Sequence, residues 1–289
     1  MEYRTAKEMA ERWNVSDRRI REMCAEGRIE GVIREGRIYK IPDHALKPAD
    51  GRGGRRKKLA NYGELFSQIE AKRGEFLRRK RQAQQEKTKL QEEFLTRFIY
   101  ETCRTAGSGL TLKETKQVLA GESIGQKSLK EFLAVMGMKE AFEYADEKAA
   151  ARTKLSERLI KEIHARIMAD HWEERGVFKD EASAKQMETL IKEDRRRRKE
   201  MHPIEADAKF FLDFLKVQPF KRGNRQTGRV ILNFLLMREG YPPVSVKPSD
   251  RETYKKAAQD FYERGDSRPL TQLLAGYVDQ ELDRLLERK

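Results

Sequence analysis

The sequence predicts a mainly α-helical protein with a small mixed N-terminal domain followed by a larger all-α domain. Apolar residues recur at helical spacing along most of the chain, whereas β-forming runs are almost absent after Ile41. A stretch rich in proline, glycine and basic residues, 47–63, separates the two patterns. We therefore expect domains at residues 1–48 and 64–289, joined by a basic linker at 49–63.

The N-terminal domain is expected to contain two short helices and a hairpin. Ala6, Met9, Ala10 and Trp13 form the apolar face of the first helix. Ser16 is a good N-cap for the second helix, and Gly27 ends it. The hairpin turns at Glu35 and Gly36, and its β-forming residues are Val32, Ile33, Ile38, Tyr39 and Ile41. This order describes a winged helix-turn-helix, and residues 1–48 resemble the small DNA-binding domains of the MerR and excisionase families.

Basic residues on this domain make double-stranded DNA the expected partner. The whole chain carries 62 Lys and Arg against 48 Asp and Glu, a net charge of +14, which favours a polyanion. A helix in the major groove can place arginines on guanine edges or phosphates, and hairpin cations can contact the backbone or the minor groove. Acidic residues alternate with these cations, so a solvated surface is the alternative. The candidates are Arg18, Arg19 and Arg21 on the second helix, and Arg34, Arg37 and Lys40 on the hairpin.

The second domain is expected to be built from helices alone. Residues 64–99 contain no proline and are rich in good helix formers, which predicts a long helix with a break near Gly74. Further helices are predicted over residues 112–119, 128–150, 156–171, 182–200, 204–216, 228–238, 251–264 and 269–287.

The cysteines and the hydropathy pattern limit the class of protein. Cys24 and Cys103 are far apart and lack metal-site spacing, so we expect neither a disulfide nor a zinc site. No apolar run approaches the roughly 18 residues of a membrane span, and no signal stretch begins the chain. We expect a soluble cytoplasmic protein with no metal, no cofactor and no membrane partner.

The segment VQPFKRGNRQTGR, residues 217–229, has the features of a phosphate-binding loop between two helices. Gly223 and Asn224 precede a helix start, where backbone N–H groups and the helix dipole favour an anion. Arg229 lies one turn further along and could reach a phosphate. These three residues, Gly223, Asn224 and Arg229, are the candidate phosphate site.

Residues 202–243 resemble the core of the Fic family, in which a helix, the loop HxFx(D/E)GNGRxxR and a second helix follow one another. Residues 98–131 resemble the inhibitory region of that family, and the sequence SERLIKEIHARIM resembles the helix before its substrate flap. The resemblance covers about residues 64–287. It implies a protein that transfers AMP from ATP to a hydroxyl group of a target protein.

Matching this loop residue by residue reveals departures from the family pattern. Gln218 occupies the position of the catalytic histidine, and an amide cannot act as a general base. Arg222 occupies the position of the acidic residue that holds magnesium, and its charge would repel the metal. Arg225 replaces the second glycine and Gln226 the first arginine, while Phe220 remains as an apolar anchor.

The inhibitory region also departs from its pattern, (S/T)xxxE(G/N). Residues 102–107 match it, and Ala106 occupies the glutamate position. Loss of this glutamate alone indicates an unrestrained enzyme, but together with Gln218 and Arg222 it indicates an inactive one. The β-hairpin flap is expected to be short or absent, because residues 181–199 have a helical pattern. We interpret His164, His171 and His202 as structural or surface residues, with a substitute base as the alternative.

The main functional hypothesis is a DNA-binding protein, a transcriptional regulator whose Fic-like domain is a catalytically inactive scaffold for homodimerisation or partner docking. The alternative is a Fic-like enzyme with altered nucleotide or phosphate-group transfer chemistry, or a nucleotide-sensing module. A protein-docking module is also considered, in which basic residues 74–89 and 195–199 would bind an acidic partner or RNA. For both basic runs, a solvated helix face is the alternative.

Overall fold

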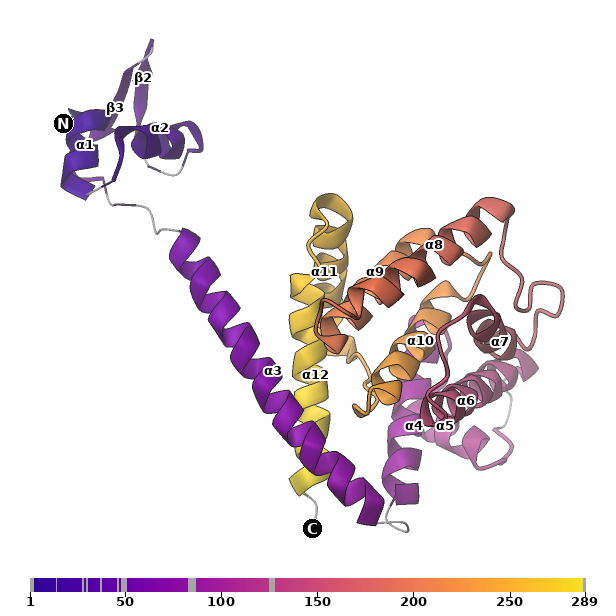
Figure 1. Cartoon of the computed structure of the whole chain (residues 1–289). Coiled ribbons are helices and arrows are strands. Elements are labelled where there is room, and N and C mark those ends of the chain that lie inside the picture. The colour runs from indigo at the N-terminus through magenta and orange to yellow at the C-terminus, as the bar shows by residue number, and fades with distance from the viewer. Residues whose placement is uncertain are drawn as a thin grey trace. The chain divides into compact units, whose positions relative to one another are not determined.

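The computed structural model describes residues 3–287, except for residues 14, 28, 30, 37, 46, 48–50, 83–86 and 125–127. The chain divides into two compact units, Met1–Gly63 and Glu64–Lys289, which are described one after the other. Figure 1 shows both units coloured along the chain. Within the described residues, no helix is both long enough and apolar enough to cross a membrane.

The first unit combines two helices with a three-stranded antiparallel sheet. The helices are α1 (Ala6–Trp13) and α2 (Asp17–Ala25), and the strands are β1 (Tyr3–Thr5), β2 (Ile33–Glu35) and β3 (Ile38–Pro42), in the order β1-β3-β2. The Ser16 side chain caps α2 by accepting a hydrogen bond from the Arg19 N–H. Met9, Ile20 and Ile41 are fully buried and form the centre of a small apolar core.

The expected linker at 49–63 is helical over the part that the structure describes. Helix α3 (Gly51–Gln82) begins at Gly51 and continues through Gly74 without the predicted break. A glycine costs a helix only about 1 kcal/mol relative to alanine. No proline occurs between residues 51 and 82, and Arg, Lys, Leu, Glu, Ala and Gln make up most of this segment. The predicted break near Gly74 is therefore wrong, whereas the assignment of residues 49–63 as a linker stays a prediction.

The described part of the second unit is all-α. Its helices, after the part of α3 that belongs to it, are α4 (Lys87–Thr105), α5 (Leu112–Leu119), α6 (Leu129–Ala150), α7 (Glu157–Ile167), α8 (Glu181–Arg197), α9 (Pro203–Val217), α10 (Asn224–Arg238), α11 (Arg251–Arg264) and α12 (Arg268–Glu287). A short 3-10 turn, Pro248–Asp250, precedes α11.

Helix α10 forms the centre of this unit. It packs against α9 on one side and against α6 and α7 on the other (Figure 1). Ile231, Phe234 and Leu235 are almost fully buried, so most of its circumference is covered. Its first turn emerges from this core at the loop that the sequence marks as a phosphate site. The core therefore holds that loop on a rigid support.

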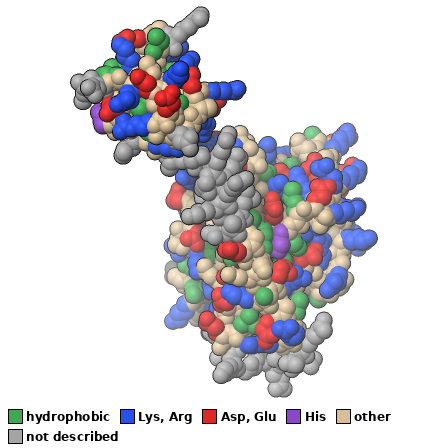
Figure 2. Space-filling model, turned by 60° about the vertical axis from the view of Figure 1, so that its left-hand side comes forward, with side chains coloured by type: hydrophobic (Ala, Val, Ile, Leu, Met, Phe, Trp, Pro, Cys, Tyr) green, Lys and Arg blue, Asp and Glu red, His purple; other side chains and the backbone are tan. Residues whose placement is uncertain are grey.

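Buried charges join α8, α9 and α10 to one another. The Arg198 guanidinium donates to Asp194 at 2.8 Å and to Asp207 at 2.6 Å. Asp207 is fully buried, and this burial raises its pKa to about 7 although Arg198 lowers it. On the face of the second unit seen in Figure 2, basic and acidic side chains are intermixed rather than separated.

Candidate phosphate-binding site

The loop between α9 and α10 owes its shape to two residues with left-handed backbone angles. Gln218 ends α9 with φ of 46°, and its N–H donates to the Phe214 carbonyl. Gly223 precedes α10 with φ of 70°, a conformation that glycine adopts without strain. A Cβ at Gly223 would lie 2.8 Å from the Met168 sulfur, so space also favours glycine.

Within the described residues, no side-chain cap is present at the N-terminus of α10. The N–H groups of Asn224, Arg225 and Gln226 are in the first turn, where a helix offers no acceptor of its own. Such groups, aligned with the positive end of the helix dipole, can bind an anion. Gly223 and Asn224 thus lie at the start of a helix, which begins four residues before the Gly228 expected from the sequence.

Asn224 uses its side chain to close the loop. Its Nδ2 donates to the Phe220 carbonyl at 2.7 Å, and its Oδ1 accepts from the Phe220 N–H at 3.0 Å. The Phe220 ring is buried. These two bonds fix the amide against the loop, and Asn224 can offer a ligand its backbone N–H and the second hydrogen of Nδ2.

His164 on α7 holds the same loop from the other side. Its ring stacks on Phe220 with a centroid distance of 3.7 Å and an interplanar angle of 2°. Nδ1 accepts from the Gly176 N–H at 2.9 Å, which leaves Nε2 protonated to donate to the Arg222 carbonyl at 3.1 Å. Burial lowers the pKa of His164 to about 4. A neutral imidazole with both nitrogens bonded positions the loop and does not act as a base.

Four cations surround the α10 N-terminus. Lys221, Arg222 and Arg225 are exposed, and Arg229 is partly buried. Arg222 Nε lies 3.7 Å from a Glu174 carboxylate oxygen. The Arg229 Nη1 donates to the Thr105 hydroxyl at 2.8 Å. Burial lowers the pKa of Arg229, and the positive charge of Arg225 acts in the same direction.

The end of α4 meets Arg229 through residues that the sequence analysis did not single out. Thr105, the last residue of α4, makes the hydrogen bond, whereas the neighbouring Ala106 is exposed in the following turn. Glu101 lies one turn earlier, is 8% exposed and accepts a hydrogen bond from Ser245, and burial raises its pKa. Glu101 and Thr105 are four residues apart and so share one helix face, and this spacing was the one sequence feature that could have indicated them as a pair.

The residues present do not fit the magnesium ion that the Fic resemblance implies. A magnesium site needs carboxylate oxygens, but Arg222 stands at the position expected to supply one. The Glu174 carboxylate lies 3.7 Å from the Arg222 guanidinium, whose positive charge would oppose a cation there. Within the described part of the chain, no group of three His, Cys, Asp or Glu side chains could hold a metal ion.

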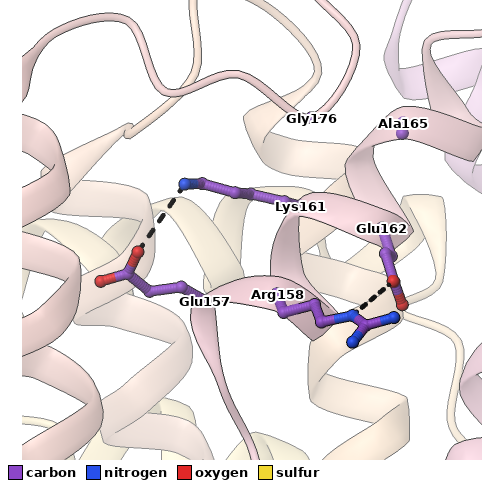
Figure 3. Close-up of a pocket in the computed structure, with 6 residues that line it drawn as sticks. All are labelled: Glu157, Arg158, Lys161, Glu162, Ala165 and Gly176. Atoms are coloured by element: carbon purple, nitrogen blue, oxygen red, sulfur yellow. Dashed lines mark hydrogen bonds and ion pairs between the residues drawn. The ribbon is translucent and has the colours of Figure 1, made fainter.

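A hollow lies along α7, and its lining differs from the residues of the loop between α9 and α10. It is lined by Glu157, Arg158, Lys161, Glu162, Ala165 and Gly176 (Figure 3). Its charged side chains pair with one another, Lys161 with Glu157 at 3.7 Å and Arg158 with Glu162 at 2.9 Å. These pairs leave no nucleophile or base directed at a common point, so the hollow is not an active-site candidate.

The cations expected to contact DNA are engaged within the first unit. Arg18 and Arg19 both pair with Glu22 at 3.2 Å, and Arg21 pairs with Asp17 at 2.9 Å. On the hairpin, Lys40 pairs with Glu35 at 2.7 Å, while Arg34 donates to the Gly36 carbonyl and lies over the Tyr39 ring. Arg37 lies outside the described residues.

Comparison with known proteins identifies a Fic/DOC domain in the second unit. Residues 154–236, which include the loop, match the sequence model of the Fic/DOC family. "Protein adenylyltransferase Fic" of Drosophila ananassae is 26% identical over 209 residues, which cover 66% of this chain and 42% of the relative. The protein of the same name from Nematostella vectensis is 27% identical over 215 residues, covering 68% and 49%. The chain thus spans less than half the length of these relatives.

Solved structures show the same fold. Fic-1 from C. elegans superposes with a TM-score of 0.71 at 24% identity, over 82% of this chain and 74% of that one. A Fic domain containing signaling protein from Bacteroides thetaiotaomicron superposes with a TM-score of 0.67 at 20% identity, over 78% and 97%. The predictions of a mainly helical protein and of a Fic-like second domain are confirmed.

The main functional prediction, a DNA-binding transcriptional regulator with an inactive scaffold, is wrong. The relatives carry the name of protein adenylyltransferases, and the fold is that of Fic proteins. The ion pairs of Arg18, Arg19, Arg21 and Lys40 lie at the surface and are weak, so they do not test these residues as DNA contacts, which stay a prediction. The resemblance of residues 1–48 to the MerR and excisionase families stays a prediction.

Proposed function

We propose that the second unit is a Fic-type group-transfer enzyme with altered chemistry. It binds a nucleotide by its phosphates at the N-terminus of α10 and transfers a phosphate-containing group to a hydroxyl of a protein. The observation that carries the proposal is the uncapped start of α10, with Gly223 before it and Arg229 one turn inside it. The family match covers this loop, and the relatives are named protein adenylyltransferases.

In the proposed reaction, the hydroxyl oxygen attacks a phosphorus atom and forms a new P–O bond. The P–O bond to the rest of the phosphate chain breaks, and that part leaves as an anion. The exposed Gln218 amide can accept a hydrogen bond from the hydroxyl and orient it, but it cannot take the proton. The proton therefore passes to a phosphate oxygen of the nucleotide. The free N–H groups of α10 stabilise the charge that develops.

The departures from the family motif define what is altered. Gln218, Arg222 and Gln226 stand where a base, a metal ligand and a phosphate-binding arginine are expected, and Ala106 stands at the inhibitory glutamate. Three of these changes remove a proton acceptor or a negative charge, and none adds an acid–base group. The proposed enzyme consequently depends on positioning and on positive charge more than on proton transfer by its own side chains.

Label transfer tests this function. The full chain is incubated with ATP labelled in the α- or the γ-phosphate, alone and with cell proteins, and labelled proteins are separated by electrophoresis. We expect label in protein with the wild type and its loss in Arg229→Ala. The exposed Arg196, near the end of α8, supplies the matched control Arg196→Ala. Thermal stabilisation by ATP without label transfer would identify a nucleotide-sensing domain instead. The absence of both label transfer and thermal stabilisation would contradict the proposal.

A further inference from the structure

The loop and first turn that form the proposed site carry an unbalanced charge. Residues 217–229 contain Lys221, Arg222, Arg225 and Arg229 and no acidic residue. These cations lie at the positive end of the α10 dipole, which adds to their field. Three of the four are exposed, so a ligand from solution can reach them.

This imbalance contrasts with the neighbouring helices. On α7 and α8, several cations pair with carboxylates one turn away, as in Arg158 with Glu162 and Lys185 with Glu181. Within the described residues, Arg222 is offset by Glu174 at 3.7 Å, while Arg229 bonds the neutral Thr105 hydroxyl and is attracted by the buried Glu101 without a direct ion pair. Within the described residues, Arg225 makes no ion pair.

Two of these cations also repel one another. Arg225 and Arg229 are four residues apart on α10 and so share one helix face. Like charges at this spacing destabilise a helix in the absence of a counter-ion. The effect of Arg225 on Arg229 is one of the causes that lower the Arg229 pKa, after burial. An anion bound between the two guanidinium groups would turn this repulsion into attraction.

A divalent cation is poorly suited to the same place. Arg222 holds the position where the family pattern supplies a carboxylate, and its guanidinium, 3.7 Å from the Glu174 carboxylate, would repel a cation there. A guanidinium presents several N–H donors to phosphate oxygens and keeps its charge at any physiological pH. It can therefore neutralise a phosphate chain in the role that a metal ion otherwise fills.

We propose that this site binds a nucleoside polyphosphate without a divalent metal ion, with Arg222 and Arg225 neutralising the phosphates beside the α10 N-terminus. The inference rests on the proposed function, because it takes the nucleotide site as given and names the form of the nucleotide that binds. The ligand is then the metal-free polyphosphate, and magnesium ions compete with the arginines for its phosphate oxygens. Magnesium shields the phosphate oxygens that the arginines would bind.

The test measures the dissociation constant of ATP and of ADP for the full chain by calorimetry, in EDTA and in excess magnesium. Binding that is equal or tighter in EDTA is the expected result. Binding that requires magnesium overturns this inference but leaves the proposed function intact. Absence of binding in both buffers contradicts the proposed function as well. The two failures are therefore distinguishable.

Charge-reversal variants locate the effect. Arg222→Glu is expected to weaken ATP binding in EDTA by about 10- to 100-fold, the range of a lost charged hydrogen bond. Arg196→Glu makes the same change of charge near the start of α9, whereas the loop follows the end of α9. Because α9 has 15 residues, its two ends are about 22 Å apart. That control is expected to weaken binding less than about threefold, as a screened distant charge should. Equal losses in both variants, with unfolding temperatures unchanged, would overturn the assignment of Arg222.

Discussion

Replacing His164 by alanine should destabilise the second unit and alter its response to acid. The substitution removes the stacking on Phe220 and the hydrogen bonds with Gly176 and Arg222. An aromatic pair contributes about 1 kcal/mol and each hydrogen bond about 1 kcal/mol, so the expected loss at pH 7 is about 3 kcal/mol.

The pH dependence has a definite sign. The pKa of His164 is lowered from 6.5 to about 4 in the folded protein, so below pH 6.5 the unfolded chain binds a proton that the folded chain does not. The contribution of His164 is complete above pH 6.5 and is lost as the pH falls to about 4. A difference of about 2.5 pKa units corresponds to about 3 kcal/mol. The advantage of the wild type over His164→Ala should therefore almost vanish at pH 4.

Urea denaturation followed by circular dichroism at several pH values between 4 and 7 measures this difference. The comparison must be between wild type and variant, because the raised pKa of Asp207 makes stability fall as pH rises in the same window. His171→Ala is the control, since that ring is 29% exposed and pairs only with Asp170 at 3.4 Å. A gap between wild type and His164→Ala that stays constant from pH 7 to pH 4 would refute the reasoning.

Two further substitutions test the loop and its contact with α4. Gly223→Ala should destabilise the protein by about 1–3 kcal/mol, because of the positive φ and the contact of the new Cβ with Met168. The control Gly265→Ala has a similar φ and open space, so its loss should come from backbone strain alone. Equal losses of unfolding free energy would show that the contact does not matter. Thr105→Val should tighten ATP binding by up to about tenfold, because it frees Arg229 from a hydrogen bond at nearly constant volume. Calorimetry compares this variant with the control Thr96→Val. Unchanged affinity in Thr105→Val would contradict the prediction.

The sequence predicts the helices of the second unit well where local signals agree. Residues 112–119 and 251–264 are helical over the expected bounds, since capping and turn residues flank them. Gly228 was taken as the start of a helix that begins at Asn224. Gly228 lies inside α10, at a position where a Cβ would approach Phe211 at 3.1 Å and Phe214 at 3.2 Å, so packing against α9 favours glycine there. Such interhelical packing leaves no local signal.

The site was predictable only in part for a similar reason. The loop residues Gly223, Asn224 and Arg229 are close in sequence, and their pattern marks a helix start. Thr105 and Glu101 belong to α4, more than 100 residues earlier, and only the tertiary fold brings them near Arg229. The three-residue strand β1 was missed because it is too short to show alternation and forms by pairing with β3.

The central claim is that a nucleotide binds by its phosphates at the start of α10. Hydrogen–deuterium exchange of the full chain with and without ATP tests it most directly, because the N–H groups of Asn224, Arg225 and Gln226 have no intrahelical acceptor and no side-chain cap among the described residues. We predict that ATP slows exchange at these three residues, and that Arg229→Ala reduces this protection. Protection confined to other segments, or none at saturating ATP, would contradict the claim.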